Sequence, residues 1–136
     1  DVLFELPLIT TRRIVVDISD QKLDAYEGDS LVFDFVASTG IEESPTIPGT
    51  FQILTKEKEA YASLWDLWMP HFIGIYRTAP DFINGIHGLP TLSSGRVLWA
   101  GYLGRPVSYG CIVSGLEEAK ELFDWAEPGT LVIIQP

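Results

Sequence analysis

Cys111 and His87 are the two residues of this chain whose types could together perform nucleophilic chemistry. A cysteine with a histidine elsewhere in the sequence is the minimum required for a thiolate nucleophile and its base. Gly110 directly precedes the cysteine, and glycine permits a positive φ or a close approach of the backbone to a ligand. As the only cysteine, Cys111 cannot form an intramolecular disulfide, and with two histidines it cannot build a cysteine-rich zinc site. The residues by themselves equally allow a second interpretation, in which Cys111 is a small buried hydrophobic residue.

Most of the chain that would position these residues has the pattern of β-strands. In residues 30–38, Leu31, Phe33 and Phe35 alternate with a wetter face, which is typical of a half-buried strand. The segment 42–49 contains two prolines and a glycine and is predicted to be a loop. The polar segment 56–62 is predicted to be a loop or a short helix. Further strands are predicted at 14–19, 22–26, 51–55, 71–76, 82–87 and 130–134.

One helix is predicted, at about residues 115–126, after the cysteine. Ser114 and Glu117 fit a capping box, in which each side chain would bond to the other residue's backbone amide. A helical stripe follows the box, and Pro128 and Gly129 would end the helix. The stripe consists of Leu116, Ala119, Phe123 and Ala126. The fold class predicted from these elements is mainly β, with one helix packed on the strands.

The composition excludes some classes of function. The chain has 136 residues, 46% of them hydrophobic, and a formal net charge of −10. This fits one globular domain and argues against nucleic acid or an anionic lipid surface as the main partner, because both require basic residues. No apolar run approaches the length of a membrane span. The chain starts without methionine or a signal-like segment, so we interpret it as a processed or partial product, with residues 1–12 as a lead-in segment and 13–136 as the domain.

Several other reactive or aromatic residues have simpler interpretations. His71 is interpreted as a surface or loop histidine and not as a second base. Trp65, Trp68, Met69 and Phe72 are interpreted mainly as packing residues of a loop, with walling of a substrate groove as the lesser alternative. Arg96 and Arg105 are interpreted as solvated, although either could contact a substrate carboxylate.

The spacing of the motifs indicates a family. Ile86-His87-Gly88 is followed by Ser108-Tyr109-Gly110-Cys111-Ile112, and Ser38-Thr39-Gly40 and 45–51 precede them. Together with the opening segment 14–26 and the ending 117–133, these motifs resemble the L,D-transpeptidase catalytic domain, the cysteine enzymes that rework bacterial peptidoglycan. The resemblance covers nearly the whole chain from about Arg13 and implies a single mixed, β-sandwich-like domain. Tyr109 departs from the pattern, because the family usually has a second histidine there, and Val113 stands where arginine is usual.

The resemblance also implies roles for individual residues. Cys111 would be the nucleophile and His87 its base, oriented by the carbonyl of Gly88. The peptide nitrogens around Tyr109, Gly110 and Cys111 would stabilise the oxyanion, and Ser108 would be a structural hydroxyl beside the nucleophile. A reactive cysteine of this kind is expected to have a depressed thiol pKa.

The function implied by the resemblance is L,D-transpeptidation. The thiolate would attack the carbonyl that joins a diamino acid to a terminal D-alanine of a peptidoglycan stem peptide, releasing D-alanine and leaving a thioester. An amine of a second stem peptide would then form a cross-link, or water would give a carboxypeptidase. The expected location is the bacterial envelope, and the expected site uses no metal and no cofactor. Two alternatives stay open: an inactive relative that binds peptidoglycan, and a structural Cys111 in a domain with an unrelated role.

Overall fold

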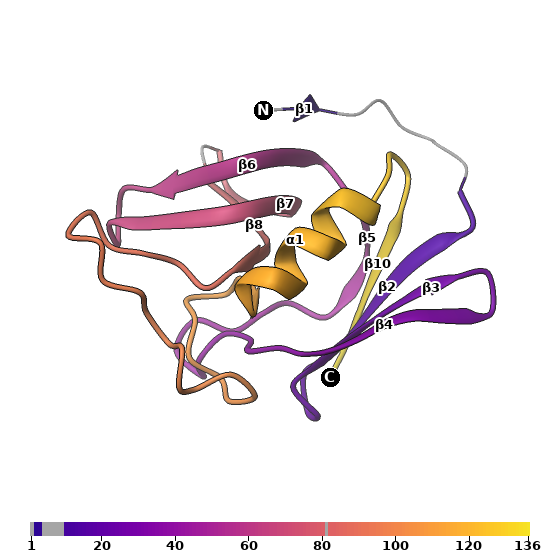
Figure 1. Cartoon of the computed structure of the whole chain (residues 1–136), viewed down its shortest axis with the longest axis horizontal. Coiled ribbons are helices and arrows are strands. Elements are labelled where there is room, and N and C mark those ends of the chain that lie inside the picture. The colour runs from indigo at the N-terminus through magenta and orange to yellow at the C-terminus, as the bar shows by residue number, and fades with distance from the viewer. Residues whose placement is uncertain (1, 4–9, 81) are drawn as a thin grey trace.

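Two five-stranded β-sheets and one helix make up the part of the protein described by this computed structural model, residues 2–3, 10–80 and 82–136 (Figure 1). The first sheet has the order β1-β6-β7-β8-β9 and the second has the order β4-β3-β2-β10-β5. The strands are β1 (Val2–Leu3), β2 (Arg12–Asp17), β3 (Lys22–Glu27), β4 (Ser30–Val36), β5 (Gly49–Gln52), β6 (Thr55–Ala62), β7 (Leu67–Ala79), β8 (Phe82–Gly88), β9 (Ile112–Ser114) and β10 (Leu131–Gln135). The mainly β class with a single helix is therefore confirmed.

The alternation of apolar and polar residues explains the second sheet. In β2, Ile14 and Val16 are fully buried, while the residues between them face outwards and are half-buried. β2 pairs antiparallel with β3 and parallel with β10, in the register Ile14 to Val132 and Val16 to Ile134. The buried side chains of these strands form one core with Ile73, Ile86 and Ile112 of the first sheet and Leu122 of the helix.

Helix α1 (Leu116–Trp125) packs on β7, β8 and β9. Figure 1 shows it beside the first sheet and facing the second. Within the described residues it is the only helix, and it is too short and too polar to cross a membrane. It follows β9, the strand that begins directly after Cys111.

The predicted capping box is wrong. The N-cap of α1 is Gly115, it carries no side-chain cap bond, and the buried Ser114 hydroxyl has no hydrogen-bond partner in the described part of the chain. Ser114 belongs to β9 and pairs with Gly88, so the strand extends to the residue that would have capped the helix. The stripe is also shifted: Leu122 is fully buried, whereas Leu116 is 48% exposed.

Two further predictions for elements are corrected by strand pairing. Residues 56–62 form most of β6 and not a loop or helix, because pairing with β7 satisfies the backbone while Lys58 and Glu59 face solvent. The strand predicted at 51–55 is divided between the two sheets, because the chain crosses from β5 to β6 at Ile53. β7 begins at Leu67, four residues before the predicted strand 71–76, so Trp68 and Met69 lie in a strand and not in the predicted loop.

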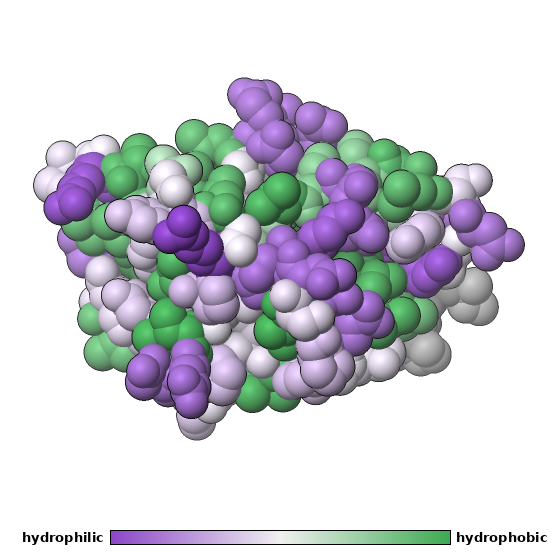
Figure 2. Space-filling view, turned by 90° about the horizontal axis from the view of Figure 1, so that it is seen from below, coloured by the Kyte–Doolittle hydropathy of each residue, from purple (hydrophilic) through white to green (hydrophobic). Residues whose placement is uncertain are grey.

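The lead-in segment predicted for residues 1–12 lies largely outside the described residues. Of its described part, β1 pairs with β6, and Arg12 begins β2. On the face seen in Figure 2, hydrophilic side chains are interspersed with hydrophobic ones and no single apolar area dominates.

Candidate active site

Cys111 lies immediately before β9, and its side chain points towards β8. The thiol is 7% exposed, accepts a hydrogen bond from the Gly85 amide at 3.5 Å and donates to Asn84 Oδ1 at 3.5 Å. Burial raises the pKa of the thiol from 9.0 to about 11, and the Gly85 amide only partly opposes this. This direction is opposite to the depressed pKa expected of a reactive cysteine, because no cation among the described residues lies beside the sulfur to favour the thiolate.

His87 lies in β8 and is 1% exposed. Its Nδ1 is 2.6 Å from the carbonyl oxygen of Gly88, and a carbonyl can only accept, so Nδ1 carries the proton and Nε2 is left as the acceptor. Burial lowers the pKa of the ring from 6.5 to about 4, although the bond to Gly88 raises it. The imidazole is thus neutral at pH 7 and held in the tautomer that a base requires.

The parallel pairing of β8 and β9 brings the two side chains to one face. Ile86 pairs with Ile112 and His87 with Val113, so Cys111 lies next to Gly85 in register. Residues two apart along a strand share a face, and His87 therefore projects to the same side as Cys111. Both side chains line one small cavity of about 10 Å³, which has room for about one water molecule. Within the described residues, no hydrogen bond joins His87 to the thiol.

Aromatic side chains cover this cavity. The Tyr109 ring stacks on Trp65 at 4.9 Å between centroids and meets Trp99 edge-on at 5.8 Å. All three line the cavity around Cys111 and His87. These three rings form the aromatic cover of the cavity, and Trp65 and Tyr109 also line the neighbouring groove.

The turn before the cysteine is fixed by three hydroxyl groups. Ser108 Oγ donates to the Cys111 carbonyl at 2.5 Å and accepts from the Gly110 amide at 3.2 Å. Ser44 Oγ donates to the Tyr109 carbonyl at 2.6 Å, and Thr46 Oγ1 donates to the Gly110 carbonyl at 2.7 Å. Gly110 has a φ of 127°, which favours glycine. Among the described residues, no acceptor takes the Cys111 amide hydrogen.

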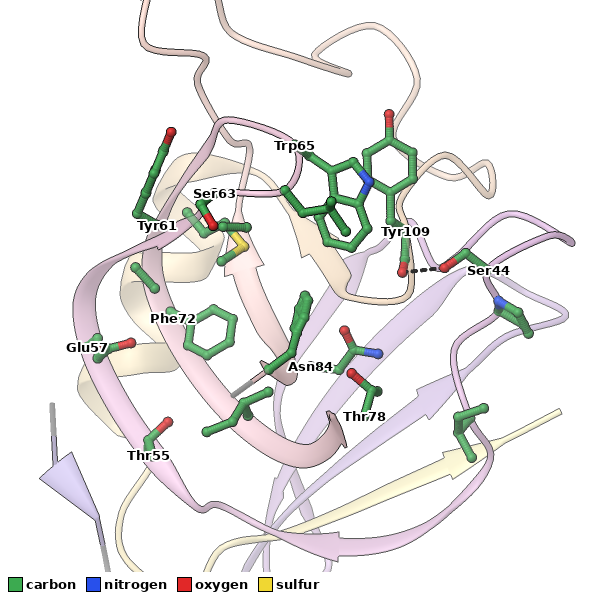
Figure 3. A pocket seen from close by; sticks show the side chains of 18 residues that line it. Ser44, Thr55, Glu57, Tyr61, Ser63, Trp65, Phe72, Thr78, Asn84 and Tyr109 are labelled. Carbon is green, nitrogen blue, oxygen red and sulfur yellow. Dashed lines mark hydrogen bonds between the residues drawn. The ribbon is translucent and has the colours of Figure 1, made fainter. Parts of the chain in front are cut away.

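A groove of about 690 Å³ adjoins the small cavity (Figure 3). Phe72 lines this groove while its neighbour His71 packs on Phe123 of α1, so the groove and the helix lie on opposite faces of the first sheet. Glu57 is the one charged side chain among the described residues that line the groove. The groove and the cavity share a wall formed by Ala62, Trp65, Met69, Phe82, Asn84 and Tyr109.

The structure brings together the residues that the sequence pointed to: Cys111, His87, Gly88, Ser108, Tyr109 and Gly110. It places His71 away from the thiol, in β7, as a half-buried residue on Phe123 and not as the expected surface or loop histidine. Trp65, Met69 and Phe72 serve both the packing and the groove, which was the lesser alternative. Arg96 and Arg105 line neither the groove nor the cavity.

The sequence patterns did not indicate that Asn84, Ser44, Thr46 and Trp99 belong to the site. Asn84 is the only asparagine of the chain and stands within an apolar strand, which is the signal that could have marked it. Thr46 lies in a quoted motif, but nothing in that motif indicates contact with the Gly110 carbonyl. In the described residues, no group of three or more His, Cys, Asp or Glu is placed to hold a metal ion.

Comparison with known proteins gives one family. The family model of the L,D-transpeptidase catalytic domain (YkuD) matches residues 11–134. No curated protein sequence matches the chain.

Solved structures have the same fold at low sequence identity. They include an L,D-transpeptidase from Mycobacterium smegmatis (TM-score 0.78, 23% identity, covering 93% of this chain and 59% of that one). An L,D-transpeptidase from Stackebrandtia nassauensis gives a TM-score of 0.73 at 21% identity, covering 96% and 58%. L,D-transpeptidase 3 from Mycobacterium tuberculosis, in complex with a faropenem-derived adduct, gives 0.75 at 21%, covering 93% and 60%. This chain therefore spans less than two thirds of each of these proteins.

Proposed function

Since this chain belongs to the L,D-transpeptidase catalytic domain family, we propose that it is a cysteine acyltransferase that acts on peptidoglycan stem peptides. The observation that carries this proposal is the shared cavity of Cys111 and His87, placed at the wall of a groove large enough for a peptide. Because peptidoglycan lies outside the cytoplasmic membrane, the proposed place of action is the bacterial envelope.

The first half-reaction uses the neutral pair. Nε2 of His87 takes the thiol proton as Sγ of Cys111 attacks the carbonyl between the diamino acid and the terminal D-alanine. The carbonyl oxygen becomes an oxyanion, which the uncommitted Cys111 amide can stabilise. The C–N bond then breaks, the D-alanine nitrogen receives the proton from His87, and a thioester remains on Cys111.

The second half-reaction transfers the acyl group. An amine of a second stem peptide gives up a proton to Nε2 and attacks the thioester carbon, which forms the cross-link and returns the proton to the sulfur. Water in the same position gives a carboxypeptidase instead. The carboxylate of Glu57 in a groove without a lining cation favours a substrate that brings an ammonium group, as a diamino acid does.

A second candidate is a weakly catalytic relative that binds peptidoglycan. The raised thiol pKa and the bond from the thiol to Asn84, in place of His87, favour it. The two candidates differ in whether a covalent intermediate forms at all.

Incubation with a tetrapeptide donor, followed by intact-protein mass spectrometry, distinguishes them. We expect release of D-alanine, a thioester adduct on the protein and no adduct on Cys111→Ser, whose hydroxyl is far less ionisable than a thiol. Faropenem offers a second acyl donor: L,D-transpeptidase 3 from Mycobacterium tuberculosis holds a faropenem-derived adduct, and we expect an adduct here. Binding of the tetrapeptide without release of D-alanine would overturn the acyltransferase proposal in favour of the binding relative.

A further inference from the structure

Asn84 is the side chain that contacts the sulfur of Cys111. Its Oδ1 accepts the thiol hydrogen at 3.5 Å, and its Nδ2 donates to the Tyr76 hydroxyl at 3.1 Å. The Tyr76 oxygen also accepts the Ile47 amide at 3.1 Å, so the phenol offers a lone pair to Nδ2 and fixes the orientation of the carboxamide. Asn84 is 5% exposed and belongs to the wall shared by the cavity and the groove.

The hydrogen-bonding capacity of Asn84 is only half used. A carboxamide can form four hydrogen bonds, two as donor and two as acceptor. The described residues supply two partners, and one of them, the thiol, is weak. A buried polar group in an apolar strand is costly unless it is paired. One Nδ2 hydrogen and one Oδ1 lone pair are therefore available to a ligand at the wall.

The Nδ2 donor of Asn84 lies beside the turn that carries the Cys111 amide, whereas the Gly110 amide predicted to share in oxyanion binding is already bonded to Ser108 Oγ. A Cβ atom placed on Gly110 would lie 2.7 Å from Asn84 Nδ2, so the carboxamide rests directly on this glycine. The Cys111 amide, which has no acceptor among the described residues, belongs to the next peptide group. In the tetrahedral intermediate the substrate's carbonyl carbon is bonded to Sγ of Cys111. If the oxygen on that carbon accepts from the Cys111 amide, it lies in the space bordered by Asn84 Nδ2.

Tyr109 does not offer an equivalent donor. Figure 3 shows the Tyr109 hydroxyl directed away from Asn84, while the ring lies against Trp65 and the backbone carbonyl bonds to Ser44. Tyr109, which stands where the family usually has a second histidine, thus packs with Trp65 and Trp99 beside the cavity. Among the described residues of the shared wall, Asn84 carries the amide donor, and Trp65 carries an indole N–H.

We propose that Asn84 is a catalytic residue whose Nδ2 donates a hydrogen bond to the acyl oxygen as negative charge develops on it. Oδ1 holds the thiol hydrogen in the resting state, and Nδ2 acts together with the Cys111 amide in the tetrahedral intermediate. This proposal rests on the proposed acyltransferase function, because only acyl transfer generates an oxyanion.

Two reactions of the same cysteine test the role. Acylation by faropenem or by the tetrapeptide passes through an oxyanion, whereas alkylation by iodoacetamide uses the thiol without one. We expect Asn84→Ala to lower the acylation rate by roughly 10²-fold, the usual effect of removing one oxyanion donor, and to change the alkylation rate by only a small factor. Rates are measured by intact mass on variants whose folding is checked by circular dichroism.

Asn84→Leu keeps the size, removes both Nδ2 hydrogens without adding a charge beside the thiol and should lose acylation to the same extent, which maintains the test if the alanine variant fails to fold. Thr130→Val is the matched control, because it removes a buried hydroxyl that bonds only to Glu127, and it should retain the acylation rate. Equal losses in acylation and alkylation would reduce Asn84 to a structural residue, and no loss in either would also overturn the proposal. A wild-type protein that is alkylated but never acylated would instead refute the proposed function.

Discussion

Cys111 and His87 are both buried, and burial acts on the two side chains in opposite directions. It raises the pKa of the thiol to about 11 and lowers that of the imidazole to about 4, so both are uncharged across the neutral range. Burial thus disfavours a preformed thiolate and imidazolium pair in the resting protein. Proton transfer must accompany attack, which makes the position of His87 more important than its basicity.

The two histidines should differ sharply in their effect on acylation. We expect His87→Ala to slow adduct formation with faropenem by roughly 10²–10⁴-fold, the usual contribution of a positioned base. His71→Ala should alter only stability, because His71 contacts Phe123 on the helix side of the sheet. The comparison is made by stopped-flow or intact mass, and a slower His71 variant would mean that the wrong imidazole has been assigned.

Tyr109→Phe should have a small effect. The ring stacks on Trp65 and meets Trp99 edge-on, and phenylalanine preserves that packing while it removes a hydroxyl directed away from Asn84. We expect the acylation rate to change by several-fold at most, which corresponds to about 1 kcal/mol. A thousandfold loss would show that the phenol takes part in the chemistry.

At the scale of the elements, two short segments determine the geometry of the nucleophile: the loop before β5 and the turn before β9. Ser44 and Thr46 come from the loop and hold the carbonyls of Tyr109 and Gly110. Because the C=O and N–H of a peptide group point in opposite directions, fixing the Gly110 carbonyl also directs the Cys111 amide. The loop before β5 thus orients the Cys111 amide, a hydrogen-bond donor that belongs to the turn before β9.

Thr46→Val tests this coupling with a nearly isosteric change. The variant leaves the Gly110 carbonyl and the Gly40 amide without the bonds they now form with Thr46, at a cost of about 1–3 kcal/mol in stability. We expect acylation to slow by roughly tenfold as the Cys111 amide loses its fixed direction. Thr50→Val, in an exposed position of β5, is the control. A melting temperature and acylation rate equal to wild type would refute the coupling.

Helix α1 offers a matched pair for stability. Leu122 is fully buried in the core shared by both sheets, and Leu122→Ala should lower the free energy of unfolding by about 2–5 kcal/mol. Leu116 is 48% exposed, and the same substitution there should cost less than about 1 kcal/mol. Urea denaturation of the two variants measures the difference, and equal losses would mean that the helix packs through another face.

The outcome for α1 illustrates which features a sequence can predict. Local patterns predicted the helix and the strands around β2 and β3, while the resemblance of the motifs to a family pointed to Cys111 and His87. They could not place Ser114 in a strand, identify residues 56–62 as β6 or assign Asn84 to the thiol, because those outcomes depend on partners distant in the chain. Pairing with β7 overrides the polar character of 56–62, and the contact of Asn84 with Cys111 requires β8 and β9 to meet.

At the scale of the whole molecule, the burial of His87 and Cys111 makes the free energy of unfolding depend on pH in both the acid and the alkaline range. Below pH 6.5 the unfolded chain binds a proton at His87, whereas the folded protein binds it only near pH 4. The free energy of unfolding therefore falls as the pH falls through this window. Between pH 9.0 and about 11 the unfolded chain loses the Cys111 proton while the folded protein keeps it, so stability falls as the pH rises. Each slope approaches about 1.4 kcal/mol per pH unit.

Urea denaturation over a range of pH measures these slopes. His87→Gln should flatten the acid limb relative to wild type, and Cys111→Ala should flatten the alkaline limb, while each leaves the opposite limb unchanged. Identical slopes in wild type and both variants would show that the two groups titrate alike in the folded and unfolded states.

The place of β10 in the second sheet has a consequence for how the protein folds. β10 is the last strand in the chain, yet it lies between β2 and β5 and joins them. Hairpins such as β2-β3 and β3-β4 can form from neighbouring residues, but the sheet cannot close until Val132 reaches Ile14 across nearly the whole chain. Such non-local pairing gives slow folding, in milliseconds to seconds, and leaves the buried faces of both sheets exposed while the protein is being synthesised. The thiol should accordingly remain open to oxidation and modification until residues 131–135 have been added and the core has closed.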